Sequence, residues 1–242
     1  MFLKVVRVDN LRNTDYAITV FKRKGITMKI NAPNIPELRE AGSMFSQIAE
    51  LQAEERAAEG LIFSSEILSD EDLTGIDYSM VEFEQCKLLG CNFNRAGFTN
   101  VRFRNCDISN CTFENSYFNQ VEFLSCKGMG SKFPNSTIKN VLFKDSNFTY
   151  ANFEHSKFQK LILSSSNFSN ACLAECILKE IELQDVTLNN CDFFKTPLKG
   201  IDFRESRIEE IILSDTHIEL RGAIVDTYQA AVLARYLGVV IK

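Results

Sequence analysis

Residues 91–123 read CNFNRAGFTNVRFRNCDISNCTFENSYFNQVEF, and every fifth residue of this stretch is a large apolar one. The series continues at the same spacing in both directions, from Phe63 to Ile218. Of its 32 positions, 30 are Phe, Leu or Ile, and the exceptions are Tyr78 and Gly128. A period of five matches neither the 3.6-residue helix nor the two-residue strand. It predicts a repeating unit made of a short extended segment followed by a turn.

A second period, of twenty residues, is nested in the first. Two residues before each large residue the chain mostly carries a small one, Ala, Cys, Ser or Thr. Every fourth such position is instead bulky and branched: Val81, Val101, Val121, Val141, Leu161, Ile181 and Ile201. Four repeats therefore form one turn of a coil, and stacked turns can pair their backbone groups at the usual strand spacing of ~4.8 Å. Eight such turns predict a rod of roughly 38 Å.

The pattern resembles the pentapeptide-repeat family, whose unit is A-(D/N)-L-x-x with Phe often in place of Leu. Asn or Asp recurs before the large residue, as in Asn92-Phe93 and Asn147-Phe148. The resemblance covers about two-thirds of the chain, and it implies a right-handed, four-sided parallel β-helix. We therefore predict an all-β fold, a right-handed quadrilateral parallel β-helix over residues 61–220 with an N-terminal α/β segment and a C-terminal helix.

Residues 1–60 precede the repeats and predict strands followed by one helix. The expected strands are Phe2–Val8, Ala17–Phe21 and Ile26–Ile30, and the expected helix spans 36–59. Such a segment would cover the unpaired first turn of the rod. An independent binding module is the alternative.

Residues 221–242 follow the repeats and predict a helix over 226–237, opened by a capping box of Asp226 and Gln229. Its apolar members are Tyr228, Ala231, Val232, Tyr236 and Leu237. The segment also resembles the C-terminal dimerisation segment of quinolone-resistance pentapeptide-repeat proteins. That resemblance implies a homodimer of two rods joined end to end through this helix, and a simple cap on the core is the alternative.

Nothing in the sequence predicts catalysis, a metal site or a cofactor. There are only two His, and seven of the eight Cys occupy the small interior position, where Cys acts as a small apolar residue. Several Ser occupy the same position, and no glycine-rich phosphate loop occurs. We therefore expect no enzyme, no cofactor and no metal, and we look for function on the outside of the rod.

The net charge of −5 disfavours binding through neutralisation of phosphates, so no direct nucleic-acid partner is expected. No stretch of 18 apolar residues occurs, and the start MFLKVVRVDNLR lacks the features of a signal peptide. The eight Cys include no CxxC pair. We predict a cytoplasmic protein without a membrane partner.

Negative charge is concentrated in the last turns. Residues 61–174 carry 12 acids and 10 bases, whereas residues 175–220 carry 11 acids and five bases. The candidate partner-binding residues are Glu180, Glu182, Asp185, Asp202, Glu205, Glu209, Glu210 and Asp215. If the C-terminal helices pair, these acids meet at the centre of the dimer. A solvated surface that aids solubility is the alternative.

The resemblance to the quinolone-resistance members implies a DNA mimic. Such a protein binds DNA gyrase, or another type II topoisomerase, and protects it from quinolones or toxins. Carboxylates spaced like phosphates would face the basic surface on which the enzyme holds DNA. The alternative is a non-enzymatic scaffold or interaction module with another protein partner, because a fold alone does not determine function.

Overall fold

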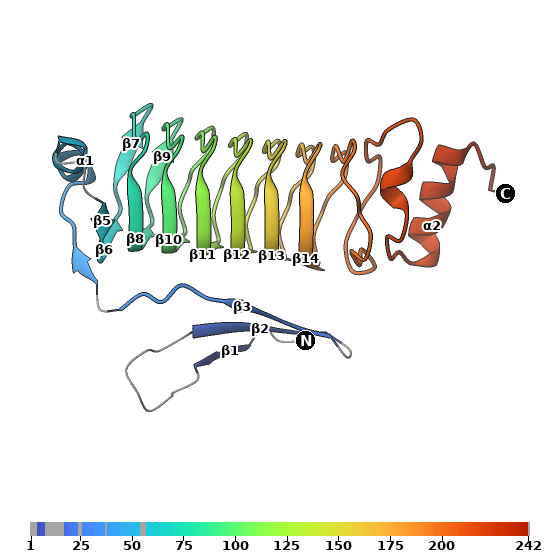
Figure 1. Cartoon of the computed structure of the whole chain (residues 1–242), viewed down its shortest axis with the longest axis horizontal. Helices are drawn as coiled ribbons and strands as arrows, with labels where there is room; N and C mark the ends of the chain where they lie inside the picture. The colour runs from blue at the N-terminus through green and yellow to red at the C-terminus, as the bar shows by residue number, and fades with distance from the viewer. Residues whose placement is uncertain (1–3, 8–16, 24–25, 37, 54–56, 242) are drawn as a thin grey trace.

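The computed structural model describes residues 4–7, 17–23, 26–36, 38–53 and 57–241. Its main body is a rod of stacked coils, with helix α1 (Met44–Ala53) at one end and helix α2 (Thr227–Ala234) at the other (Figure 1). The rod is a parallel β-solenoid of about seven turns, which confirms the predicted fold class.

One long strand from each coil forms a continuous parallel sheet along the rod. Its members, in chain order, are β6 (Leu61–Ser64), β8 (Asp77–Glu84), β10 (Gly97–Arg104), β11 (Tyr117–Leu124), β12 (Thr137–Lys144), β13 (Lys157–Ser164) and β14 (Ile177–Gln184). Strands β7 (Ile67–Ser69) and β9 (Lys87–Leu89) pair on another side. Partners are twenty residues apart, as in Val101 with Val121, so each coil repeats the one before it.

A left-handed backbone conformation at every fifth residue makes the coil four-sided. Most corners are non-glycine residues with φ near +55°, and four successive ones are Asn100, Asn105, Asn110 and Asn115. Asn tolerates this conformation better than most side chains. In the coil that starts at β12, the first side is 137–139, the second 141–144, the third 146–149 and the fourth 151–154. The same names apply to the equivalent residues of the other coils.

The interior explains why the small position favours Ser and Cys over Ala. The Ser136 hydroxyl donates to the Phe113 carbonyl at 2.7 Å, and its oxygen accepts the backbone N–H of Ser116 at 3.1 Å. The Cys111 thiol likewise donates to the Leu88 carbonyl. Beside these polar columns the Phe rings stack, with Phe103 and Phe123 4.9 Å apart. Small hydrogen-bonding residues thus satisfy backbone groups that the solenoid core buries.

Gly128, the gap in the column of large residues, is filled from the next coil. The neighbouring Met129 does not fill the space, because its side chain is 49% exposed. The ring of Phe148 turns edge-on instead, at 84° to Phe143. A Cβ on Gly128 would lie 2.6 Å from Phe148 Cδ1, so this glycine is required by the ring above it.

The N-terminal helix is shorter than the expected 36–59. Residues on both sides of α1 extend the sheet, because β4 (Arg39–Glu40) pairs with β6 and β5 (Ala58–Glu59) pairs with β8. As short strands, these residues form backbone hydrogen bonds with the solenoid sheet that they could not form as part of a longer helix. Helix α1 buries Met44, Ile48 and Leu51 in the solenoid core, so it covers the first coil.

The three strands expected before the helix are present as β1 (Lys4–Arg7), β2 (Ala17–Arg23) and β3 (Ile26–Asn31), in one antiparallel sheet. Strand β3 runs along the rod and not over its end (Figure 1). Its Met28 and Ile30 pack on Leu142 and Ile162 of the second side. The chain continues along this side, where the side-chain amide of Gln120 donates to the Ala32 carbonyl.

The repeat register changes in the last coil, contrary to the expectation that it is unbroken to Ile218. Asp202 pairs with Ile224, which is 22 residues on, so two residues are added. Ile218 is 54% exposed, and Leu220 packs against the core in its place. The irregular end reduces the expected eight turns to about seven.

Helix α2 closes this end of the core. Its capping box is formed as predicted, with the Asp226 side chain accepting the Gln229 N–H at 2.8 Å. The buried Gln229 amide donates to the carbonyls of Phe203 and Ser206 at 2.8 and 2.7 Å. It therefore satisfies carbonyls that another coil would otherwise have paired. The helix continues into η2 (Arg235–Leu237) and stops at Gly238, with φ +73°.

We predict that Gly128→Leu, which restores the repeat pattern, lowers the free energy of unfolding by about 1–3 kcal/mol because it overpacks the core. Adding Phe148→Leu should recover most of the loss. Urea unfolding of the parent, the single and the double variant measures both effects. A single variant at least as stable as the parent would contradict the packing described here.

We predict that Gln229→Ala lowers the free energy of unfolding by about 1–3 kcal/mol, because it leaves two buried carbonyls and the backbone N–H of Asp226 without partners. The control is Tyr228→Ala on the same helix, since Tyr228 is 68% exposed. That control should change stability by less than about 0.5 kcal/mol. Equal effects in urea unfolding would refute a capping role for Gln229.

Candidate functional site

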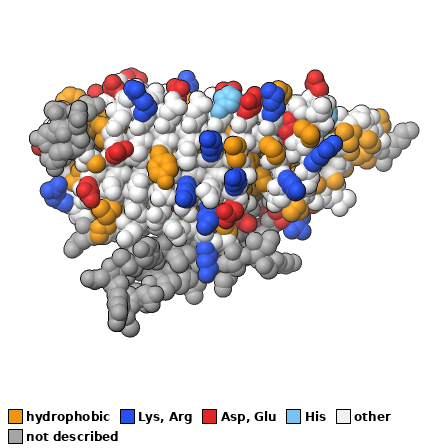
Figure 2. Space-filling view, in the orientation of Figure 1, with side chains coloured by type: hydrophobic (Ala, Val, Ile, Leu, Met, Phe, Trp, Pro, Cys, Tyr) orange, Lys and Arg blue, Asp and Glu red, His pale blue; other side chains and the backbone are white. Residues whose placement is uncertain are grey.

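The eight candidate acids surround the last coils and do not form a single stripe. Glu180 lies at the corner between the first and second sides, and Asp185 lies at the next corner. Glu209 and Glu210 lie at the corner after the third side. Figure 2 shows acidic side chains scattered over the visible face in the same way. The sequence therefore locates the charge along the rod, while the coil distributes it around the rod.

Some of these acids have basic neighbours. The Asp202 carboxylate accepts two hydrogen bonds from Arg204, at 2.7 Å from Nη2 and 3.0 Å from Nε. Glu180 and Glu182 line a groove of about 360 Å³ beside β3. Three lysines line the same groove: Lys29, Lys160 and Lys199. The negative charges of Asp202, Glu180 and Glu182 are thus partly offset by neighbouring positive charges.

Six of the eight acids are exposed, and four of these belong to the last coil. Glu205, Glu209, Glu210 and Asp215 are all exposed. The backbone N–H of Asp185 donates to the Glu205 carbonyl at 3.0 Å, so these two acids lie on adjacent coils at one corner. The C-terminal end of the solenoid therefore presents carboxylates at several corners.

Glu219 is an acid of the same region with a structural role. It is 2% exposed, and its Oε1 accepts the backbone N–H groups of Lys195 and Ser214 at 2.8 and 3.1 Å. Burial raises the pKa of Glu219, but these hydrogen bonds outweigh burial and hold that pKa below its usual value. The carboxylate secures the segment in which the register changes.

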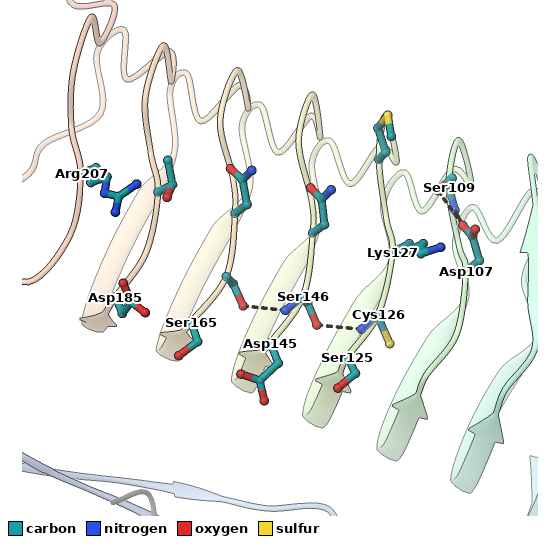
Figure 3. Close-up of a pocket in the computed structure, with 15 residues that line it drawn as sticks. Asp107, Ser109, Ser125, Cys126, Lys127, Asp145, Ser146, Ser165, Asp185 and Arg207 are labelled. Atoms are coloured by element: carbon teal, nitrogen blue, oxygen red, sulfur yellow. Dashed lines mark hydrogen bonds between the residues drawn. The ribbon is translucent and has the colours of Figure 1, made fainter. Parts of the chain in front are cut away.

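A shallow groove of about 800 Å³ follows the third side of the rod (Figure 3). Its charged residues are of both signs: Asp107, Lys127, Asp145, Asp185 and Arg207. The Ser146 hydroxyl in the groove donates to the Lys144 carbonyl at 2.8 Å. Its oxygen accepts the Cys126 N–H at 2.9 Å. This hydroxyl is thus engaged in hydrogen bonds with the backbone. Among its described hydrogen-bond partners there is no base that could activate it as a nucleophile.

The cysteines have the environment of packing residues. All eight are unpaired, and only Cys172 is partly exposed. Burial raises the pKa of Cys176 and of Cys191 to about 12 and also raises the pKa of Cys172, which disfavours the reactive thiolate. In the described part of the chain, no three His, Cys, Asp or Glu are grouped as a metal site. No helix in that part is long and apolar enough to cross a membrane.

The expected dimer residues differ in their surroundings. The Tyr236 hydroxyl donates to the Ile211 carbonyl at 2.6 Å, so this residue belongs to the cap. Ala231 and Val232 are half-buried, whereas Tyr228 and Leu237 are 68% and 71% exposed. The tail beyond the helix adds further exposed apolar side chains: Val239, Val240 and Ile241.

A family model described as a pentapeptide repeat region matches residues 76–153 and again 137–218. Among solved structures, a trypsin-treated form of QnrB1, a plasmid-mediated fluoroquinolone resistance protein, is 21% identical, with 75% of this chain and 91% of that chain covered and a TM-score of 0.45. HetL from the cyanobacterium Nostoc sp. strain PCC 7120, a pentapeptide repeat protein involved in heterocyst differentiation regulation, is 14% identical, with 74% and 91% covered and a TM-score of 0.29. No curated protein matches the chain. Because the family model spans more than half of its length, the chain belongs to the pentapeptide-repeat family.

Proposed function

We propose that this chain is a non-enzymatic DNA mimic that binds DNA gyrase, or another type II topoisomerase, and protects it from quinolones or toxins. The observation that carries this proposal is the acidic C-terminal end of a rigid rod. Glu205, Glu209, Glu210 and Asp215 are exposed there on consecutive corners of the last coil. A fixed scaffold holds these carboxylates in place before a partner arrives, which lowers the entropy cost of binding.

The spacing of the coils suits an imitation of a phosphate backbone. Side chains in one column repeat every ~4.8 Å along the rod. One strand of a duplex presents a phosphate every ~3.4 Å along its axis. A topoisomerase surface that attracts phosphates would attract such carboxylates through the same long-range field. Asp185 and Glu205 illustrate the arrangement, because they occupy adjacent coils at one corner.

We further propose that two copies join through the exposed apolar end of α2 and the tail. Leu237 is 71% exposed and Val240 is 80% exposed, with Tyr228 on the same helix. A contiguous apolar patch of this kind is uncommon on a monomer and marks an interaction site. A two-fold axis here would bring the same patch of each copy together. The two acidic ends would then meet at the centre of a longer rod.

A scaffold with another protein partner is the second candidate function, and the N-terminal segment favours it. Strand β3 covers Leu142 and Ile162, so the second side is occupied by the chain itself. In a scaffold that binds partners on some sides of the rod only, a covering strand such as β3 would keep partners off the remaining side. For either function we propose the cytoplasm, because eight unpaired cysteines fit a reducing compartment.

We predict that the full chain binds gyrase and protects supercoiling against a quinolone, and that binding weakens as salt rises. Neutralising four exposed acids together should weaken binding about tenfold, given a few tenths of a kcal/mol for each surface charge. The variant is Glu205→Gln, Glu209→Gln, Glu210→Gln and Asp215→Asn. The control neutralises four acids near the other end: Glu59→Gln, Asp70→Asn, Asp77→Asn and Glu114→Gln. Absence of binding, inhibition and protection in a supercoiling assay would end the topoisomerase proposal.

We predict a dimer in sedimentation velocity that Leu237→Asp combined with Val240→Asp converts to a monomer, because two charges would be buried at the joint. Tyr236→Phe is the matched control, since it removes the hydrogen bond to Ile211 and keeps the apolar surface. That control should remain dimeric. A parent chain that is already monomeric at micromolar concentration refutes the dimer.

A further inference from the structure

In the coils between residues 137 and 200, the net charge of one side of the rod is opposite in sign to that of the other three sides together. The first side with its corner carries five lysines and one glutamate between residues 137 and 200, a net charge of +4. The residues of that side are 137–140, 157–160, 177–180 and 197–200. The rest of the same coils, residues 141–156, 161–176 and 181–196, carries two lysines and six acids, a net charge of −4. The first side is therefore basic in an acidic protein.

The five lysines are accessible to a partner, although two of them, Lys160 and Lys199, share a groove with Glu180 and Glu182. They are Lys139, Lys157, Lys160, Lys179 and Lys199, and each is exposed or half-exposed. Among the described residues, none of the five forms an ion pair within 4 Å. Figure 2 shows several Lys and Arg side chains over the middle of the visible face, with others toward both ends. Lys29 of β3 extends the group at the edge of this side.

The backbone register sets the spacing of these lysines. Lys139 pairs with Gln159, and Gln159 pairs with Lys179, in adjacent strands of the parallel sheet. Lys199 follows one coil further on. At ~4.8 Å per coil, the distance from the level of Lys139 to that of Lys199 is about 14 Å. Along a duplex this length holds about four phosphates of one strand.

We propose that the first side of the rod binds the phosphate backbone of duplex DNA without reading its sequence. Lys binds phosphate as a flexible point charge, and phosphate contacts dominate non-specific affinity. The described residues of this side form flat sheet in β12 to β14, and none of them belongs to a helix or loop that could enter a groove and reach base edges, so the side contacts backbone only. The net charge of −5, from which no nucleic-acid contact was expected, averages this basic side with acidic parts of the chain.

The same chemistry argues against a protein or a membrane as the partner. Lysine is depleted in protein–protein interfaces, whose centres are apolar. Tyr117 and Ile177 are the exposed apolar residues of this side, at 43% and 48%, and they lie three coils apart. Membrane surfaces are bound by an apolar face that inserts beside the basic residues. Two separated side chains on a flat sheet do not form such a face.

The test is fluorescence polarisation of a labelled 30-base-pair duplex titrated with the full chain, with no topoisomerase present. We expect a dissociation constant of about 1–100 μM near 0.1 M salt, and a slope of log K against log salt of about −4. The variant Lys139→Gln, Lys179→Gln and Lys199→Gln should weaken binding at least tenfold and reduce the slope by about 3. The three matching Lys→Arg replacements should preserve binding, which shows that charge is the cause.

The control removes the same net charge from other sides of the rod: Lys87→Gln, Lys127→Gln and Lys132→Gln. All three of these lysines are exposed, and the control should change the affinity less than twofold. Equal losses in the two Gln variants would overturn the proposal, because net charge and not the first side would then govern binding. So would absence of duplex binding by the parent, or binding to phosphatidylserine vesicles without binding to DNA. Because no topoisomerase is present, failure here leaves the gyrase proposal unaffected.

Discussion

The structure depends on one constraint, the backbone pairing of each residue with the residue twenty positions on. In this register the N–H of Asn105 donates to the Leu124 carbonyl, and the N–H of Ser125 donates to the Lys144 carbonyl. The pairing requires a left-handed corner every fifth residue, and the corners in turn define four sides. A residue's number within its coil therefore decides whether it packs, turns or faces solvent. Every surface property of the rod follows from that assignment.

Both ends of such a rod need a cover, because the last coil has no neighbour to pair with. At the start, β4 and β5 continue the pairing and Met44 of α1 enters the core. At the end, the Gln229 amide and the Tyr236 hydroxyl donate to carbonyls of the last coil. This leaves the outer surface of α2 without a role in the cap. Leu237, which is 71% exposed, takes no part in closing the core, and this exposure is what motivates the proposed dimer.

The interior was predictable from the sequence because local spacing alone sets it, and the expected columns of Phe and small residues are present. What depends on contacts between distant segments was not predictable. Gly128 is filled by Phe148 and not by its neighbour Met129, because the nearest atoms belong to the next coil. The contact of β3 with the second side was missed, although the sequence contains a signal. Leu142 and Ile162 are apolar at an outward position where every other coil except the first, which has Ile62, carries Glu, Arg or Asp.

The charge of the rod shows why a count along the chain was a limited guide to function. Counting placed the acids correctly in the last coils, yet Glu180 and Lys179 are adjacent in sequence, and the corner at Glu180 turns the chain onto another side. In a solenoid, the charges that a partner meets together are those of stacked residues on one side. They are therefore summed down that column of residues and not along one segment of the sequence. By that sum, charges that cancel in the composition separate between residues 137 and 200 into one basic side, two acidic sides and one uncharged side. A partner meets one side at a time, so it responds to this separated charge.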